Sequence, residues 1–314
     1  MISAVLAAVI PALYWAQPVE TAPAVRQAGI ERLCVPPGAA AAWRAAGLTV
    51  SPLGDDERSR RTTLGPVGLR SRPDLASASA RPWVFANGWR FQRAPGGRYW
   101  CDAPTGRAAL AAAEAFAYGA DVVLAIDPSD LEAFGRMLAF LSSVPDSALR
   151  PAADVAVVDD GSPTVGEVLN LMARRNLLFE VVPREIPDGL LNVRVGSAEF
   201  PRKDARDPEA FALSVRHRLT DERRSLRIFG SEVVLARLLR DAGHARLHLL
   251  NYGGRPIDGL RVVLRGSWAP VEARVFGESA AGAEELVASG GATELTLPTL
   301  GPYAIVDLVS PPRP

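Results

Sequence analysis

The pattern of apolar and polar residues divides the chain into three parts. In residues 12–145, short apolar runs such as "ALYWA", "IERLCVPP" and "LTVSPL" alternate with segments of helical character. Two of these segments end at Gly29 and Gly47, and glycine is a frequent residue just past a helix. Strands that alternate with short helices predict parallel βα units, so this part is expected to be an α/β domain.

Residues 54–80 interrupt this alternation, because "GDDERSRRTTLGPVGLRSRPDLASASA" is polar and rich in Arg and Ser. We expect a long excursion there, with a short strand at 67–70. The next stretch, "PWVFANGWRFQRAPGGRYWCDAP" (82–104), predicts a β-hairpin or two strands that turn at "APGG". An alanine-rich helix, a buried parallel strand at 122–127 and an amphipathic helix then complete the domain.

A second pattern begins after a linker at 145–153. Residues 152–230 contain a new βαβ unit, followed by elements that include the helix "DPEAFALSVRHRL" and the strand "LRIFG", and they predict a flavodoxin-like layer. From 231 to 312 the residues alternate with a period of two between regularly spaced turns, which predicts an antiparallel β-sandwich. The expected fold class is therefore α/β followed by all-β.

The first eleven residues, "MISAVLAAVIP", are apolar and uncharged. They fit the apolar region of a signal segment, which predicts a bacterial protein exported to the periplasm or the extracellular space. The alternative is a buried first strand that starts at Met1, in which case the protein is cytoplasmic. The run is too short to span a bilayer, so no transmembrane segment is expected.

Cys34 and Cys101 could pair in an exported protein and would be buried thiols in the cytosol.

Charge and motifs exclude several classes of function. The 35 basic residues balance 35 acidic ones, so no electrostatic footprint for nucleic acid is present. His244 and His248 lie across a predicted turn and strand, which gives no helical metal-ligand pair. The sequence has no phosphate-binding loop, dinucleotide fingerprint or nucleophile elbow, and no cofactor is expected. Gly161, Ser162 and Thr164 stand at a helix N-terminus, where the alternatives are an ordinary N-cap and an anion site.

Two carboxylates occupy the sequence positions of a catalytic pair. Hydrolysis of a glycosidic bond normally needs one protonated carboxyl group and one ionised one, and such groups lie where parallel strands end. Asp102 ends "RYWCD" and Asp127 ends "VVLAID". The alternatives are a turn residue for Asp102 and a helix cap for Asp127. Glu114 lies within the alanine-rich helix, where a helix-face acid is the alternative to a cleft residue.

Aromatic residues give a second indication of a carbohydrate site, because sugar rings stack on Trp and Tyr while neighbouring polar groups bind the hydroxyls. Five of the six tryptophans precede residue 101. Alternation in "WVFANGW" would place Asn87 on the same side as its aromatic neighbours. The alternative is that these rings pack the domain together. The expected substrate-binding residues are Tyr14, Trp15, Asn87, Trp89, Arg90 and Trp100.

Several stretches resemble the family 42 β-galactosidases and related bacterial glycoside hydrolases. They are "AALAAAEAFAYGADVVLAID", "DVAVVDDGSPTVGEVLNLMARRNLLFEVV", "ARLHLLNYGGRPIDGLRVVL" and "TLPTLGPYAIVDL". The resemblance implies a TIM-like barrel, a glutamine-amidotransferase-like middle domain that mediates homo-oligomerisation, and a small antiparallel β domain. A full barrel needs about 250 residues, so the TIM-like domain expected at 12–145 is abbreviated.

The resemblance also implies a catalytic acid that follows an asparagine, but the nearest sequence, "ANG" at 86–88, has glycine in the acid's place. Two functions are therefore expected as alternatives. The first is a glycoside hydrolase that acts on a glycan through Asp102 and Asp127 in a tryptophan-lined cleft. The second is a non-catalytic carbohydrate-binding or cell-envelope protein on the same scaffold.

Overall fold

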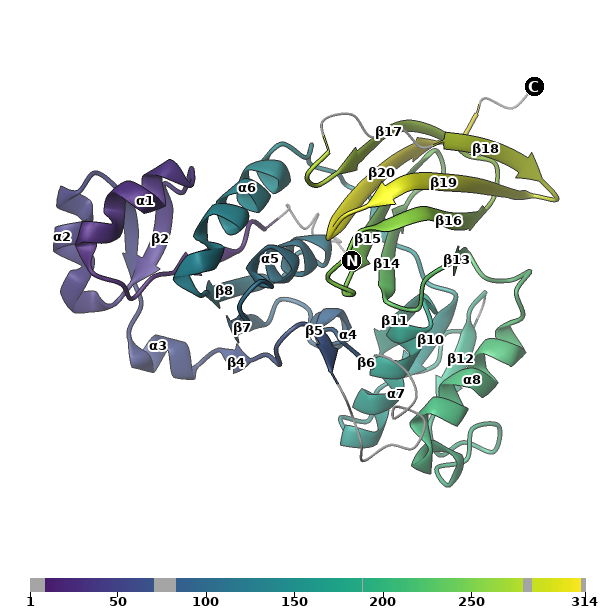
Figure 1. Ribbon diagram of the computed structural model, residues 1–314. Helices are drawn as coiled ribbons and strands as arrows, with labels where there is room; N and C mark the ends of the chain where they lie inside the picture. The colour runs from purple at the N-terminus through teal and green to yellow at the C-terminus, as the bar shows by residue number, and fades with distance from the viewer. Residues whose placement is uncertain (1–8, 71–82, 188, 279–283, 312–314) are drawn as a thin grey trace. The chain divides into compact units, whose positions relative to one another are not determined.

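The computed structural model describes residues 9–70, 83–187, 189–278 and 284–311 (Figure 1). The chain divides into two compact units, Met1–Gly68 with Phe85–Ala148, and Leu69–Val84 with Leu149–Pro314. The segment expected to direct export falls mainly in residues 1–8, which lie outside the described residues, so export stays a prediction. No helix in the described ranges has the length and apolar character needed to cross a membrane.

The N-terminal unit is built on one parallel sheet of six strands, in the order β3-β2-β1-β8-β7-β4. Every neighbouring pair runs parallel, which confirms the α/β organisation expected for this part of the chain. The first three apolar runs of the sequence become its first three strands. The strands are β1 (Ala12–Tyr14), β2 (Arg32–Val35), β3 (Thr49–Pro52), β4 (Thr62–Thr63), β7 (Arg98–Asp102) and β8 (Asp121–Ala125).

Short helices make the crossovers that parallel strands require. The first two helices end where Gly29 and Gly47 adopt φ angles of +75° and +84°, a left-handed conformation that glycine takes at little cost. The amphipathic pattern after β8 forms a helix that buries Phe134 and Leu141. The helical segments are η1 (Val19–Thr21), α1 (Ala22–Gln27), η2 (Pro37–Ala39), α2 (Ala40–Ala45), α3 (Asp55–Ser59), α4 (Gly88–Arg93), α5 (Ala108–Ala117), η4 (Pro128–Asp130) and α6 (Leu131–Ser142).

One face of this sheet is a continuous hydrophobic surface. The parallel register aligns Leu13 with Leu33 and Leu124, and aligns Leu124 with Cys101. All four side chains are at most 3% exposed. The alanine-rich helix α5 contacts β8 and is buried along most of its length. Burial of this apolar face supplies a large share of the stability of the unit.

The opposite face of the sheet, here called the open face, is only partly covered. Trp100 is the largest side chain of a small buried cluster on it. Around this cluster Tyr14 and Ala125 are half-buried, while Ser51 and Asp102 are exposed. Parallel sheets in α/β proteins are normally covered on both faces. The open face therefore differs from an ordinary core surface, because a small buried cluster on it is bordered by half-buried and exposed residues.

Residues 83–104 contain two strands, one of the two expected arrangements, but these strands belong to different sheets and do not form a hairpin. β6 (Trp83–Phe85) pairs with β5 (Gly68–Arg70) in a separate two-stranded sheet. The chain then turns into helix α4, and β7 pairs in parallel with β8. The period-two pattern therefore ends before Asn87, and the residues after it do not share one side of a strand.

A distant carboxylate explains why the chain turns into a helix at this point. Glu114 of α5 is 1% exposed. Its carboxylate accepts hydrogen bonds from the backbone N–H groups of Asn87 at 2.6 Å and of Gly88 at 3.1 Å. A negative charge stabilises a helix N-terminus. Since the partner lies 26 residues along the chain from Gly88, no local pattern reveals it.

The second unit begins with a small parallel layer, which confirms the βαβ unit expected after the linker. β10 lies at its centre between β11 and β12, and both pairs run parallel. The elements of this layer are β10 (Val155–Val158), α7 (Pro163–Arg174), β11 (Phe179–Val182), β12 (Leu191–Arg194), η5 (Asp204–Arg206) and α8 (Pro208–Leu219).

The C-terminal part of this unit consists of two antiparallel sheets that share one hydrophobic core. Its strands keep the expected period of two, so that Leu247 and Leu249 of one strand both face this core. The first sheet contains β13 (Leu226–Phe229), β16 (Ile257–Arg265), β19 (Ala292–Leu300) and β18 (Glu284–Ser289). The second contains β17 (Ala269–Val275), β20 (Tyr303–Val309), β15 (His244–Asn251), β14 (Val234–Arg240) and β9 (Arg150–Pro151).

Two strands lie on the other side of the expected domain boundaries. β13, the "LRIF" segment expected in the parallel layer, pairs antiparallel with β16, because Leu226 and Ile228 pack against the shared core. β9, in the expected linker, pairs with β14. The boundary before the antiparallel part therefore lies ahead of β13 and not at residue 230.

Candidate functional site

The carboxyl edge of the six-stranded sheet collects three of the expected site residues. Tyr14 is the last residue of β1, Asp102 is the last residue of β7, and Asp127 follows the end of β8 by two residues. The register pairs Tyr14 with Ala125 and Ala125 with Asp102, so the three residues belong to three adjacent strands. In parallel α/β folds the functional groups gather at this edge.

Trp100 lies on the open face, two residues before Asp102, and is 1% exposed. Tyr14 packs edge-on against it with the ring centroids 4.9 Å apart, and the guanidinium of Arg58 lies 4.3 Å from its ring centroid. Within the described residues, its Nε1 donor is buried without a hydrogen-bond partner. Trp100 thus has the aromatic surface and the donor that a sugar ring needs, and both are covered in this conformation.

Asp102 is exposed, with 63% of its side chain accessible, and its nearest charged partner is again Arg58, at 3.8 Å. Such an ion pair between exposed groups contributes roughly 0–1 kcal/mol, so a ligand can displace it. Arg58 belongs to α3, which buries none of its residues. The sequence gives no signal for this arginine, because it lies in the polar run "DDERSRR" without a distinctive spacing.

Asp127 caps the short helix η4, which confirms the capping alternative for this residue. Its carboxylate accepts hydrogen bonds from the Ser129 hydroxyl at 2.6 Å and from the Ser129 backbone N–H at 2.9 Å. These two hydrogen bonds lower the pKa of Asp127, because they stabilise the ionised form. An ionised carboxylate suits a nucleophile or a base and does not suit a general acid.

The remaining expected binding residues are engaged within the fold. Trp15 is 2% exposed, and its Nε1 donates to the Thr21 hydroxyl at 2.9 Å. Asn87 is 2% exposed, and its Nδ2 donates to a backbone carbonyl at 2.9 Å. Trp89 is 9% exposed and lies under the Arg90 guanidinium, 4.2 Å from its ring centroid. These contacts agree with the packing alternative, and these residues do not line an open cleft.

Two of the three histidines make polar contacts within the described structure. His248 is buried and shares a 2.6 Å hydrogen bond with the Tyr303 hydroxyl. His244 is exposed beside Asp241. In the described part of the chain, no three His, Cys, Asp or Glu side chains are grouped closely enough to hold a metal ion.

Comparison with solved structures finds matches to glycoside hydrolases. An alpha-L-fucosidase, isoenzyme 2 from Paenibacillus thiaminolyticus, is 12% identical with a TM-score of 0.52, and the match covers 87% of this chain and 70% of that chain. A GH42 beta-galactosidase from G. stearothermophilus is 9% identical with a TM-score of 0.36, over 68% of this chain and 54% of that chain. No protein-family model and no curated protein matches the sequence. The likeness to the fucosidase shows that the chain has a glycoside-hydrolase-like fold.

Proposed function

We propose that this protein binds a carbohydrate at the carboxyl edge of its N-terminal sheet, on the open face. The observation that carries the proposal is the grouping of Tyr14, Trp100 and Asp102 there, on a sheet face that is only partly covered. Aromatic rings supply a stacking surface, and a carboxylate accepts hydrogen bonds from sugar hydroxyls. The glycoside-hydrolase-like fold supports a sugar as the ligand.

In this proposal Arg58 occupies the place of the sugar when the site is empty. Its guanidinium lies over the Trp100 ring and beside the Asp102 carboxylate, which are the two groups that a bound sugar would contact. The exposed helix α3 carries Arg58 and can move without unpacking a core, because it buries none of its side chains. A ligand would then replace one weak ion pair and one cation–π contact.

The geometry favours binding over hydrolysis, because the Asp127 carboxylate is already engaged as a helix cap by Ser129. Hydrolysis through Asp102 and Asp127 stays a second proposal, since Asp102 ends β7 and Asp127 follows the adjacent parallel strand β8 by two residues. A carboxyl separation of about 5–5.5 Å in a ligand complex would fit a retaining enzyme, and about 6.5–9.5 Å an inverting one.

The architecture of the family 42 enzymes extends this proposal to the whole chain. The six-stranded sheet would be an abbreviated TIM-like barrel, the parallel layer a flavodoxin-like domain, and the two antiparallel sheets a β-sandwich. The flavodoxin-like layer would join copies of the chain, which sedimentation at micromolar concentration tests directly. Export to the periplasm or the extracellular space would place the protein where it meets glycans.

A glycan array screened with the full chain tests the proposal. Asp102→Asn should weaken binding to the glycans that bind the unaltered protein by about tenfold, because a charged hydrogen bond is lost. Asp146→Asn is the matched control, since Asp146 is also exposed and lies outside the site. A protein that binds no glycan, or an Asp102→Asn variant with unchanged affinity, would contradict the proposal. Release of reducing sugar from the bound glycans would select hydrolysis over binding alone.

A further inference from the structure

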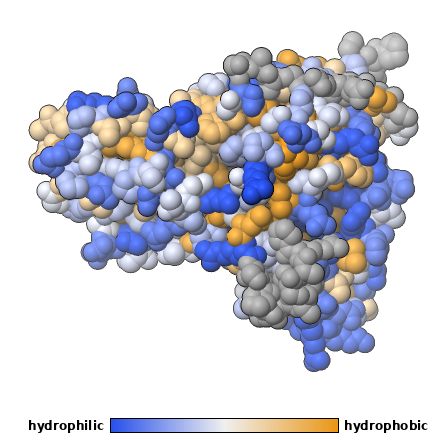
Figure 2. Space-filling view, viewed as in Figure 1, coloured by the Kyte–Doolittle hydropathy of each residue, from blue (hydrophilic) through white to orange (hydrophobic). Residues whose placement is uncertain are grey.

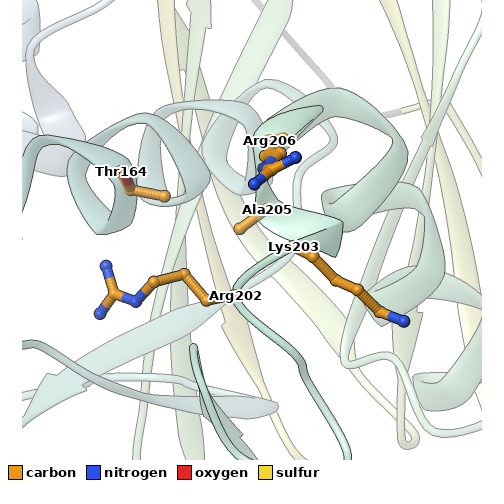
Figure 3. A pocket seen from close by; sticks show the side chains of 5 residues that line it. All are labelled: Thr164, Arg202, Lys203, Ala205 and Arg206. Carbon is orange, nitrogen blue, oxygen red and sulfur yellow. The ribbon is translucent and has the colours of Figure 1, made fainter.

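A pocket of about 350 Å³ lies in the second unit, beside the first turn of α7, and the candidate carbohydrate site does not use it. The residues that line it are Thr164, Arg202, Lys203, Ala205 and Arg206 (Figure 3). Hydrophilic residues dominate the surface of this part of the chain, at the lower right of Figure 2. Three of the five lining residues are cationic, and none is acidic.

The topology of the parallel layer places this pocket where ligands bind in open α/β folds. From β10 the chain passes through α7 to β11 on one side, and β12 lies on the other side of β10. The point where the strand order reverses is a crevice outside the carboxyl ends of β10 and β12. Thr164 follows β10 and residues 202–206 follow β12, so the pocket draws its lining from both sides of this crevice.

The cations of the pocket are only partly neutralised. Arg202 pairs with Asp160 at 2.5 Å. Lys203 and Arg206 are exposed, and neither forms an ion pair with a residue that the structure describes. In Figure 3 Arg202 extends below Thr164, Arg206 lies above Ala205, and the Lys203 side chain extends away from the other four residues. The two arginines and Lys203 therefore give the lining of the pocket a net positive charge.

Besides the cationic side chains, Thr164 contributes hydrogen-bond donors to the lining of the pocket. Ser162 caps α7 by accepting a hydrogen bond from the Val165 N–H at 3.3 Å, and Pro163 has no N–H to donate. The Thr164 backbone N–H has no partner within the described chain. Thr164, which carries this N–H and a hydroxyl, lines the same pocket as Arg202 and Arg206. Guanidinium groups bind phosphate through paired hydrogen bonds.

We propose that this pocket binds a phosphate group, either as inorganic phosphate or as the phosphate of a small phosphorylated molecule. Arg202 and Arg206 hold the phosphate oxygens, the Thr164 hydroxyl and N–H bind a third oxygen, and Lys203 attracts the anion from the rim. A pocket of this volume is at the lower end of the range for small-molecule sites, which fits a phosphorylated sugar or smaller. Asp160 competes with the ligand for Arg202, because its carboxylate holds the same guanidinium.

Titration calorimetry of the full chain with inorganic phosphate, at constant ionic strength against sodium chloride, tests this proposal. Arg202→Ala and Arg206→Ala should each weaken phosphate binding by about tenfold, because each removes a charged hydrogen-bond donor. Arg255→Ala is the matched control, since Arg255 is an exposed arginine of the antiparallel part. A second titration uses glucose 6-phosphate and separates the two sources of phosphate. If glucose 6-phosphate binds more tightly than inorganic phosphate, the ligand is a phosphorylated sugar.

Asp160→Asn distinguishes a ligand site from a merely structural ion pair. The asparagine keeps an oxygen that can accept the Ser162 N–H, now 2.9 Å from Asp160, but it releases Arg202 to the ligand. Phosphate should therefore bind several-fold more tightly to this variant. Phosphate binding no tighter than that of chloride, equal affinity in all arginine variants, or no gain in Asp160→Asn would each overturn the proposal.

Discussion

The guanidinium of Arg58 lies 4.3 Å from the ring centroid of Trp100, and this contact covers the largest aromatic group on the open face. The two residues come from different elements, the exposed helix α3 and the central part of β7. A cation–π contact at an exposed site contributes about 0.5–1 kcal/mol. The cover over Trp100 is therefore weak, and its removal should change ligand access more than it changes stability.

Arg58→Ala should raise the affinity for the glycan identified on the array by about threefold to tenfold, because the ligand no longer displaces the guanidinium. Acrylamide should also quench tryptophan fluorescence more strongly in this variant. Arg60→Ala is the matched control, since Arg60 is exposed at the end of the same helix and its side chain makes no ring contact in the described structure. A lower glycan affinity in Arg58→Ala would mean that Arg58 itself binds the sugar.

The sequence predicts where the strands and helices of this protein lie along the chain better than it predicts which other elements they contact. Short apolar runs, separated by helices that end at Gly29 and Gly47, suffice to locate the first strands because these signals are local. The helix at Gly88 depends on Glu114, and the position of β13 depends on the shared core. Both are contacts between residues distant in the chain, which periodicity does not report.

The candidate site shows the same limit. Strand ends can be read from the sequence, so Asp102 and Tyr14 were expected at the carboxyl edge. Burial of a tryptophan and the position of Arg58 over it depend on how an irregular polar segment folds back onto the sheet. The alternation that grouped Asn87 with its aromatic neighbours did not anticipate the turn into α4.

Gly135→Ala should destabilise the N-terminal unit by about 1–3 kcal/mol, although alanine favours helices. A Cβ at Gly135, in the middle of α6, would lie 1.9 Å from the backbone oxygen of Ala28. Backbone at this distance cannot yield without separating the two elements. Gly38→Ala is the control, because a Cβ there meets nothing within 4 Å. Urea unfolding measures the stability of both variants. If Gly135→Ala is as stable as Gly38→Ala, the close packing of α6 against the end of α1 is contradicted.

Glu114→Ala should lower the free energy of unfolding by about 3 kcal/mol, because it leaves the buried N–H groups of Asn87 and Gly88 without their acceptor. Glu114→Gln keeps one acceptor oxygen and should cost less. Glu132→Ala serves as the control, since Glu132 is an exposed helix-face acid with 78% of its side chain accessible. A loss below 0.5 kcal/mol, on the order of ordinary surface substitutions, would show that Glu114 does not hold the start of α4.

Cys34 and Cys101 should stay reduced even under oxidising conditions. Both are free and buried, and the register places them on opposite faces of the sheet, because Cys101 aligns with Leu124 and Cys34 aligns with Tyr14. Burial raises the pKa of the Cys101 thiol to about 12, which keeps the reactive thiolate scarce. Alkylation after denaturation should label both cysteines in the oxidised sample. A mass two hydrogens lower, with no labelling, would contradict this arrangement.

Stability should fall as the pH drops from 6.5 to 5, and His248 should account for this fall. Burial, followed by the nearby charges of Arg237 and Arg246, lowers the pKa of His248 well below 6.5. The unfolded chain takes up a proton in this range and the folded chain does not, so lower pH favours unfolding. One such histidine costs about 1.5 kcal/mol over this interval. Carboxylates with lowered pKa values, such as Asp160, reduce the stability only at lower pH, where the unfolded chain begins to protonate them.

The substitution His248→Gln isolates this effect, because glutamine does not titrate and can still bind the Tyr303 hydroxyl, which now lies 2.6 Å from His248 Nδ1. The quantity to compare is the change in unfolding free energy between pH 6.5 and pH 5, measured by urea unfolding at each pH. The variants can differ in absolute stability without affecting this pH-dependent change in unfolding free energy. In His248→Gln the unfolding free energy should change little between pH 6.5 and pH 5. In His244→Gln, at an exposed position, it should fall as much as in the unaltered protein. If the fall persists in His248→Gln, another group takes up the proton, and a neutral buried imidazole between β14 and β20 is not what limits acid stability.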